Sequence, residues 1–97
     1  MSDKRELKEH VQAGVEARRV SLIRLADQLH ATPEIAFEEV ESAALLSAAL
    51  AENGFDVERG VAGLETAFVA TCQGRPGDGP SVAILSEYDA LPGLGHA

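Results

Sequence analysis

Hydrophobic positions in the first third of the chain recur with the period of a helix. Leucines and valines are spaced by three, four and seven between residues 3 and 30, which predicts one long amphipathic helix over that range. These positions are Leu7, Val11, Val15, Leu22, Leu25 and Leu29. We expect the helix to end near His30, because Pro33 disfavours a helical conformation at the preceding Thr32.

A second helix is predicted next, and two starting points fit its sequence. Thr32 can cap a helix that has Pro33 at its first position, or the helix starts nearer Phe37. Acidic residues crowd this beginning, where the helix dipole favours negative charge. They are Glu34, Glu38, Glu39 and Glu41. The pair Asn53-Gly54 supplies the left-handed stop that ends many helices.

Beyond the second helix the pattern changes from a helical to an alternating period. Residues 55–61 alternate apolar and polar side chains and predict a half-exposed strand, and residues 66–72 predict a second strand. Residues 73–80 hold three glycines and two prolines, which indicates a loop. Residues 81–86 predict a third strand, whose continuous apolar centre is typical of a strand buried on both faces.

The predicted order is two helices and then three strands, which indicates the α/β fold class. A strand buried on both faces needs a layer of structure above and below it, and two helices cover only one face of a sheet. A chain of 97 residues buries only about 60–65% of its unfolded surface. We therefore interpret residues 1–97 as one incomplete domain, the opening part of a larger α/β domain.

Composition and charge exclude several kinds of partner. The chain has 16 acidic and 8 basic residues and a formal net charge of -8, which opposes binding to nucleic acid or to an anionic membrane. Most of the basic residues precede residue 25, so an acidic remainder follows a mixed-charge helix. That remainder is a solvated surface or lies near a cation or cationic substrate. The single cysteine suits a reducing compartment, and we expect a cytoplasmic location.

Glu87 and Asp89 are the best candidates for a functional site, because they directly follow the third predicted strand. In α/β sheets, ligands bind outside the carboxyl ends of the strands. The two side chains point the same way if the chain stays extended, and they diverge if it turns at Tyr88. A carboxylate here can orient a metal-bound imidazole, ligate a metal or act as a general base. Alternatively, it is a loop acid that accepts backbone N–H bonds.

Other chemically active residues lack a supporting pattern. His96 stands alone in a glycine-rich loop, without a Cys/His cluster or an HExxH motif around it. Cys72 closes an apolar strand and is predicted to be a buried small hydrophobe. Ser81 and Ser86 lack the setting of a nucleophile elbow, and the glycines of residues 73–80 suit a hairpin loop better than a phosphate site.

Four stretches of the chain carry a family resemblance, and they occur in the family's order. They are HATPEIAFEEVE at residues 30–41, NGFDV at 53–57, GLETAFVA at 63–70 and EYDALPGLGHA at 87–97. The sequence resembles the zinc amidohydrolases of the M-twenty metallopeptidase family, which include aminoacylases, hippurate hydrolases and carboxypeptidases. The last stretch is the most specific, and its form is similar to the branch of aminobenzoyl-glutamate hydrolase-like enzymes and animal dipeptidases.

The resemblance implies a fold and an activity. The fold is a zinc-peptidase-like, three-layer αβα catalytic domain, of which this chain is the N-terminal portion. The activity is hydrolysis of an amide bond in N-acyl amino acids, aminobenzoyl-glutamate or dipeptides by water that a divalent metal activates, the metal being zinc. The implied partners are such a small substrate and, for the parent protein, a second copy in a homodimer. The rival reading is a non-catalytic acidic α/β interaction module.

Site residues carry over from the family at few positions. Asp89 matches the acid that supports the active site two positions after a metal-binding histidine, and Glu87 stands at that histidine's position. His96 and Ala97 match the residues just before the ligand cysteine. We therefore expect the metal ligands and the catalytic glutamate to lie after Ala97. This chain alone is then expected to bind no metal and to be inactive.

Overall fold

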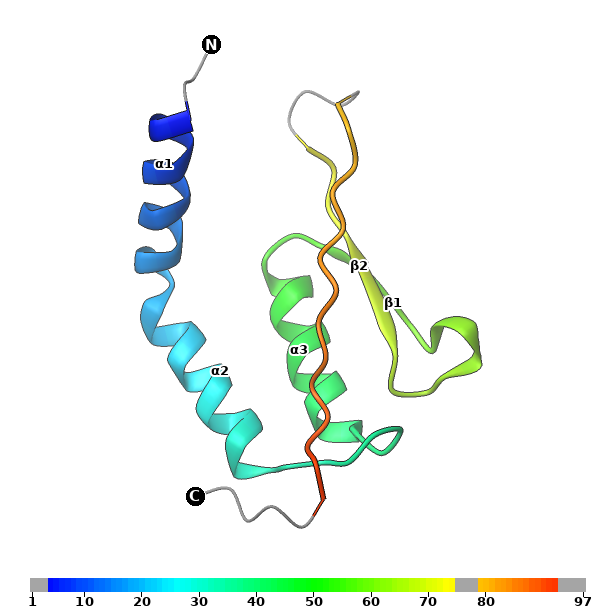
Figure 1. Cartoon of the computed structure of the whole chain (residues 1–97). Coiled ribbons are helices and arrows are strands. Elements are labelled where there is room, and N and C mark those ends of the chain that lie inside the picture. The colour runs from blue at the N-terminus through cyan, green and yellow to red at the C-terminus, as the bar shows by residue number, and fades with distance from the viewer. Residues whose placement is uncertain (1–3, 75–78, 93–97) are drawn as a thin grey trace.

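The computed structural model describes residues 4–74 and 79–92, which form three α-helices, a two-stranded hairpin and a final extended segment (Figure 1). The elements are α1 (Lys4–Ala17), α2 (Arg19–Ala31), α3 (Val40–Glu52), β1 (Asp56–Arg59), the short 3-10 helix η1 (Val61–Gly63) and β2 (Phe68–Thr71). The α/β class expected from the sequence is confirmed. No helix in these two described ranges is long and apolar enough to cross a membrane.

The single helix predicted over residues 3–30 is wrong in one respect, because it is divided at Arg18. The backbone N–H of Arg18 bonds to the carbonyl of Val15, three residues back, at 3.1 Å. The Gly14 carbonyl, which would otherwise accept that N–H, receives the Arg18 guanidinium instead at 3.0 Å. This tightened turn separates α1 from α2. The helix end predicted near His30 is confirmed to within one residue, since α2 ends at Ala31.

Helix α3 begins later than a Thr32 cap would place it. That alternative is wrong, and the start near Phe37 is the better one, because Phe37 takes a left-handed φ of 67° and the helix begins at Val40. The predicted stop is confirmed: Gly54 has a φ of 90° and donates to the Ala51 carbonyl. The next amide, that of Phe55, reaches back to the Leu50 carbonyl at 3.1 Å, which completes a Schellman motif.

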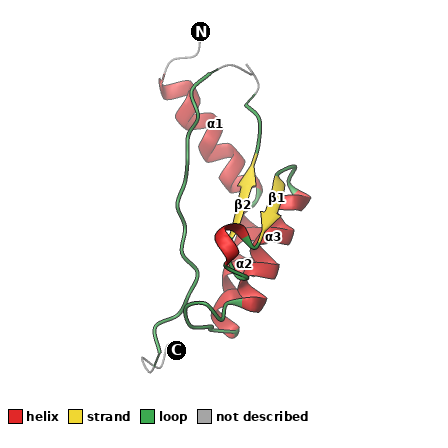
Figure 2. Cartoon of the chain, turned by 90° about the vertical axis from the view of Figure 1, so that its right-hand side faces the viewer, coloured by secondary structure: helices red, strands yellow, loops and turns green. Residues whose placement is uncertain are grey.

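The hairpin confirms the first two predicted strands, at shorter lengths. Strands β1 and β2 pair antiparallel, with Asp56 opposite Thr71 and Arg59 opposite Phe68. Helix α3 packs on both strands and forms a second layer over the hairpin (Figure 2). Its buried side is made of small residues, and Ala43 is completely buried. Small side chains let the helix backbone come close to the strands.

The third predicted strand is wrong for the described part of the chain. Residues 79–91 run as an extended segment with no strand pairing there, and Val82, Ile84 and Leu85 are 85%, 86% and 96% exposed. A strand forms only where a neighbour satisfies its backbone groups, and an apolar run is buried only where layers cover it. The described residues supply one helical layer and one hairpin, so they form two layers and not the three of the implied αβα domain.

The packing of α3 on the hairpin yields a stability prediction. We expect Ala43→Leu to lower the free energy of unfolding by about 1–3 kcal/mol, because added methylenes at a fully buried position force neighbours apart. Ala48→Leu is the matched control, since Ala48 lies on the exposed side of the same helix. Urea unfolding followed by circular dichroism measures both. Equal effects of the two substitutions would contradict the observed packing.

Candidate functional site

A shallow cleft of about 250 Å³ lies where three segments distant in the sequence meet. The segments are the loop before α3, the loop before β2 and residues 86–89. The lining residues are Ala36, Phe37, Glu39, Leu64, Thr66, Ala67, Ser86, Glu87, Tyr88 and Asp89. The cleft therefore combines apolar walls with three carboxylates, and it includes both acids that the sequence singled out.

The extended segment reaches this cleft through two hydrogen bonds. The Tyr88 hydroxyl donates to the Thr66 carbonyl, and its ring stacks on Phe68 with the centroids 5.9 Å apart. Two residues further along, the Ala90 amide donates to the Glu34 carbonyl at 2.7 Å. The end of the extended segment is thus tied to the loops that precede β2 and α3.

Thr66 connects Tyr88 to the start of α3. It is only 8% exposed, and its hydroxyl donates to the Glu39 carboxylate at 2.9 Å. Partial burial raises the pKa of the Tyr88 phenol above its ordinary value, and the negative charge of Glu39 raises it further. The positive charge of Arg59 acts in the opposite direction.

Glu34 organises the beginning of α3 from outside the helix. Its carboxylate accepts the backbone N–H groups of Glu41 at 2.9 Å and of Ser42 at 2.7 Å. These are donors of the first helical turn, which have no partner within the helix. The bond from the Glu41 amide is the main cause that lowers the pKa of the Glu34 carboxyl below its ordinary value.

The two predicted site residues lie on either side of Tyr88. Glu87 and Asp89 both line the cleft and are exposed, and neither carboxylate has a hydrogen-bond or ion-pair partner within the described residues. The alternative in which they accept backbone N–H groups is therefore not seen there. The structure brings the two acids to one cleft, and their catalytic role stays a prediction.

The sequence pattern did not predict the contacts made by four residues at or beside this cleft. They are Glu34, Glu39, Thr66 and Tyr88. Glu34 and Glu39 stood out as acids at the predicted start of the second helix, and all four residues lie within the family-like stretches. Their contacts were not predicted, because their side-chain partners lie up to 27 residues away in the chain. A pattern along the chain does not contain such pairings.

Of the other sequence candidates in the described residues, Ser86 lines the cleft and Cys72 does not. Cys72 is exposed, so its prediction as a buried residue is wrong; it follows the last residue of β2, where no described element covers it. His96 and Ala97 lie outside the described residues, as do positions 75–78 of the predicted loop. Within the described ranges no group of three His, Cys, Asp or Glu side chains could hold a metal ion. The described residues alone do not fit a zinc site.

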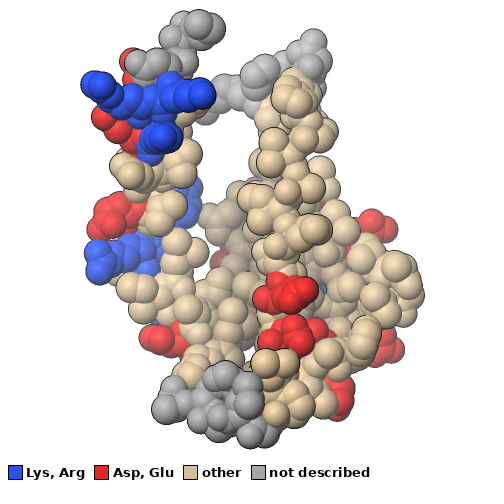
Figure 3. Space-filling model, in the orientation of Figure 1, with Lys and Arg blue, Asp and Glu red and all other residues tan. Residues whose placement is uncertain are grey.

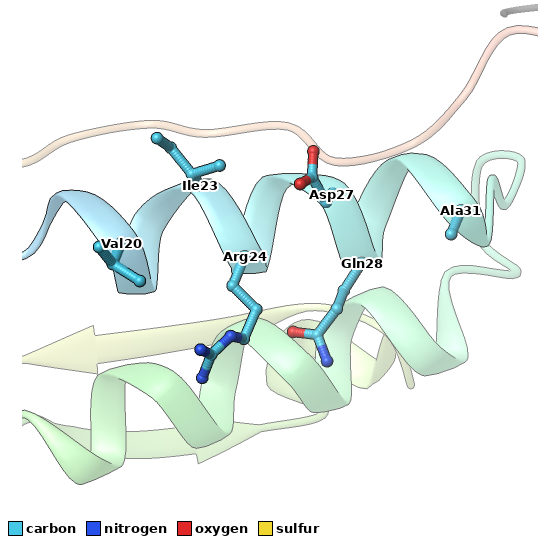
Figure 4. A pocket seen from close by; sticks show the side chains of 6 residues that line it. All are labelled: Val20, Ile23, Arg24, Asp27, Gln28 and Ala31. Carbon is cyan, nitrogen blue, oxygen red and sulfur yellow. The ribbon is translucent and has the colours of Figure 1, made fainter.

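A second hollow runs along α2 and is distinct from the cleft. It measures about 440 Å³ and is lined by one helix, with Arg24 and Gln28 pointing toward α3 (Figure 4). Basic side chains gather on α1 and near the junction with α2, with acidic ones among them, and further acidic side chains lie over the lower part of the extended segment (Figure 3). The cleft is the better candidate for chemistry, because it brings together three segments and three carboxylates, whereas this hollow is lined by a single helix.

Comparison with known proteins identifies relatives over most of the chain. The chain is 41% identical over 90 residues to one of the subunits of p-aminobenzoyl-glutamate hydrolase from Escherichia coli, a match that covers 92% of this chain and 18% of that protein. It is 38% identical over 71 residues to N-acetylcysteine deacetylase of Bacillus subtilis, and 35% identical over 71 residues to thermostable carboxypeptidase 2 of Saccharolobus solfataricus. Each of these two matches covers 73% of this chain and 18% of the relative. No protein-family model matches the chain.

By their names these relatives are a hydrolase subunit, a deacetylase and a carboxypeptidase, and the chain is similar to a segment of each. The resemblance to the M-twenty metallopeptidase family is thereby confirmed, and the chain is homologous to a segment of its enzymes. The chain spans about 18% of the length of the curated relatives that it matches.

The contacts of Glu34 yield a pH-dependent prediction. A lowered pKa means that the carboxylate stabilises the fold above its ordinary pKa of 4.5, and that this stabilisation is lost as the pH falls below that value. We expect Glu34→Gln to lower the thermal midpoint by about 2–5 °C near neutral pH. The difference from the wild type should shrink in acid, where the wild-type carboxyl is protonated as well.

Glu38→Gln is the matched control for this substitution, because Glu38 is an exposed acid in the same loop. Thermal unfolding followed by circular dichroism over a range of pH values measures all three proteins. A Glu34→Gln midpoint equal to that of the control at neutral pH would contradict the capping role.

The chain contains one tyrosine and no tryptophan, so the phenol signal comes from Tyr88 alone. We expect its pKa to lie above 10.0 in the folded chain, and to fall in Glu39→Gln while staying above that of the unfolded chain. The stability that Tyr88 contributes is fully present below pH 10.0, the ordinary pKa of the phenol, and is lost as the pH rises through the raised pKa of the folded chain. Near-ultraviolet titration of the phenolate measures this pKa, and Glu38→Gln should leave it unchanged.

Proposed function

We propose that this chain is part of a hydrolase that cleaves the amide bond of N-acyl amino acids, aminobenzoyl-glutamate or dipeptides. The observation that carries the proposal is the 41% identity over 90 residues to the p-aminobenzoyl-glutamate hydrolase of Escherichia coli. The stretch with Glu87, Tyr88 and Asp89, which resembles the family most specifically, forms one side of the cleft. Sequence similarity and the position of the cleft therefore support the same function.

In this proposal Asp89 supports the active site from the rim of the cleft, and Glu87 is the weaker candidate beside it. Phe37 and Leu64 give the cleft an apolar wall, which suits the acyl or side-chain part of a small substrate. The two acids are exposed and unpaired within the described residues, so they are available to other groups.

The proposal includes a divalent metal, by resemblance zinc, which polarises the scissile carbonyl and activates water when bound. The described residues hold no set of three ligands, so in this proposal the metal takes ligands from outside the described residues. A homodimeric parent protein and a cytoplasmic location also belong to the proposal. The 97-residue chain alone is proposed to be inactive.

An exchange of segments tests this function. The matching 90 residues of the Escherichia coli hydrolase are replaced by those of this chain, and the chimera is assayed with p-aminobenzoyl-glutamate. We expect turnover in the chimera, and a loss of about 10²-fold or more in kcat for Asp89→Asn, because a supporting carboxylate acts on the chemical step. The isolated chain should show neither turnover nor bound zinc.

Glu38→Gln in the chimera is the control, since it removes an acid that does not line the cleft. A folded chimera without activity, or an Asp89→Asn chimera with full activity, would contradict the proposal. Turnover by the isolated chain with one or two bound ions would contradict its expected inactivity.

One observation favours a second function, that of a non-catalytic interaction module. Val82, Ile84 and Leu85 are almost fully exposed on an extended segment that is unpaired in the described structure, and such surfaces favour association. Analytical ultracentrifugation of the chain distinguishes the two functions when combined with the chimera. A discrete oligomer together with an inactive chimera would favour the interaction module.

A further inference from the structure

The backbone on either side of Asp89 is held at two points. On one side, the Tyr88 hydroxyl donates to the Thr66 carbonyl; on the other, the Ala90 amide donates to the Glu34 carbonyl at 2.7 Å. The rest of the extended segment has no comparable support, since Leu85 is 96% exposed. The two bonds therefore restrain the chain at the position of the proposed supporting acid.

Both acceptors are themselves held in place. Thr66 is buried and bonded through its hydroxyl to Glu39, the residue just before α3. Glu34 is bonded through its carboxylate to the first turn of α3. Both anchors therefore connect the segment around Asp89 to the start of α3.

We propose that Tyr88 is a positioning residue, whose hydroxyl bond to Thr66 and stacking on Phe68 hold Asp89 at the cleft. The inference rests on the proposed function, because it assigns Tyr88 a role through Asp89. Tyr88 does not act on the substrate itself. Its side chain is directed to the hairpin, between the two acids that stay exposed.

The physical basis is the sensitivity of catalysis to the position of a supporting group. A displacement of about 1 Å can lower a rate by about 10²-fold. A phenylalanine at position 88 keeps the ring that stacks on Phe68 and removes only the hydroxyl bond. The substitution therefore loosens the segment while it leaves the hairpin packed.

The first measurement is made on the 97-residue chain by backbone amide relaxation. In the wild type we expect a rigid amide at Asp89, with an order parameter of about 0.8, falling below about 0.6 in Tyr88→Phe. Far-ultraviolet circular dichroism should show unchanged helices and hairpin. Val82→Ala, on the exposed part of the same segment, is the matched control. It should change neither the order parameter at Asp89 nor the circular dichroism spectrum.

The second measurement uses the hydrolase chimera. We expect Tyr88→Phe to lower kcat by about tenfold while KM changes by less than about twofold, since a displaced supporting acid acts on the chemical step. A role in general stability would not separate the two constants in this way. Val82→Ala should leave both constants at the wild-type values.

The outcomes are distinct. An unchanged amide order at Asp89, or an unchanged kcat in an active chimera, overturns the positioning role. If Tyr88→Phe does not fold, Phe68→Leu decides: selective loss of order at Asp89 supports the role, and general loss of the hairpin overturns it. An inactive wild-type chimera refutes the proposed hydrolase function, while the amide order still decides the role of Tyr88.

Discussion

The interaction on which the arrangement depends is the double use of Glu34. Its carboxylate satisfies two amides in the first turn of α3, and its carbonyl accepts the amide of Ala90. A residue in the loop between two helices thereby connects the beginning of one helix to a segment more than fifty residues later. Without the first contact α3 begins with unsatisfied donors, and without the second the acidic segment loses one of its anchors.

The cleft follows from this connection. Tyr88 adds a second anchor, because its hydroxyl donates a hydrogen bond to the Thr66 carbonyl and its ring stacks on Phe68. Two neighbouring acids are left exposed at the cleft, and they belong to the stretch that most resembles amide-bond hydrolases. The cleft therefore places two exposed carboxylates beside the apolar side chains of Phe37 and Leu64.

The largest difference between expectation and structure concerns residues 81–86. Their apolar run is the pattern of a strand covered on both faces, yet Ile84 is 86% exposed and no described strand pairs with the segment. Pairing and covering layers come from other segments, and this chain spans about 18% of the length of its relatives. The apolar run is thus typical of a paired strand between two covering layers, which the described residues do not form.

The sequence by itself determined the α/β class, the end of α2 before Pro33, the stop at Gly54 and the two acids of the candidate site. These features depend on local rules: proline restricts its predecessor, glycine adopts a positive φ, and side chains alternate along a strand. Only the three-dimensional structure showed the break at Arg18 and the start of α3, because each depends on which nearby carbonyl or amide is left free for a side-chain partner. The anchoring of Tyr88 was decided by tertiary structure alone, because its partners Thr66 and Phe68 lie on a segment that is distant in the chain.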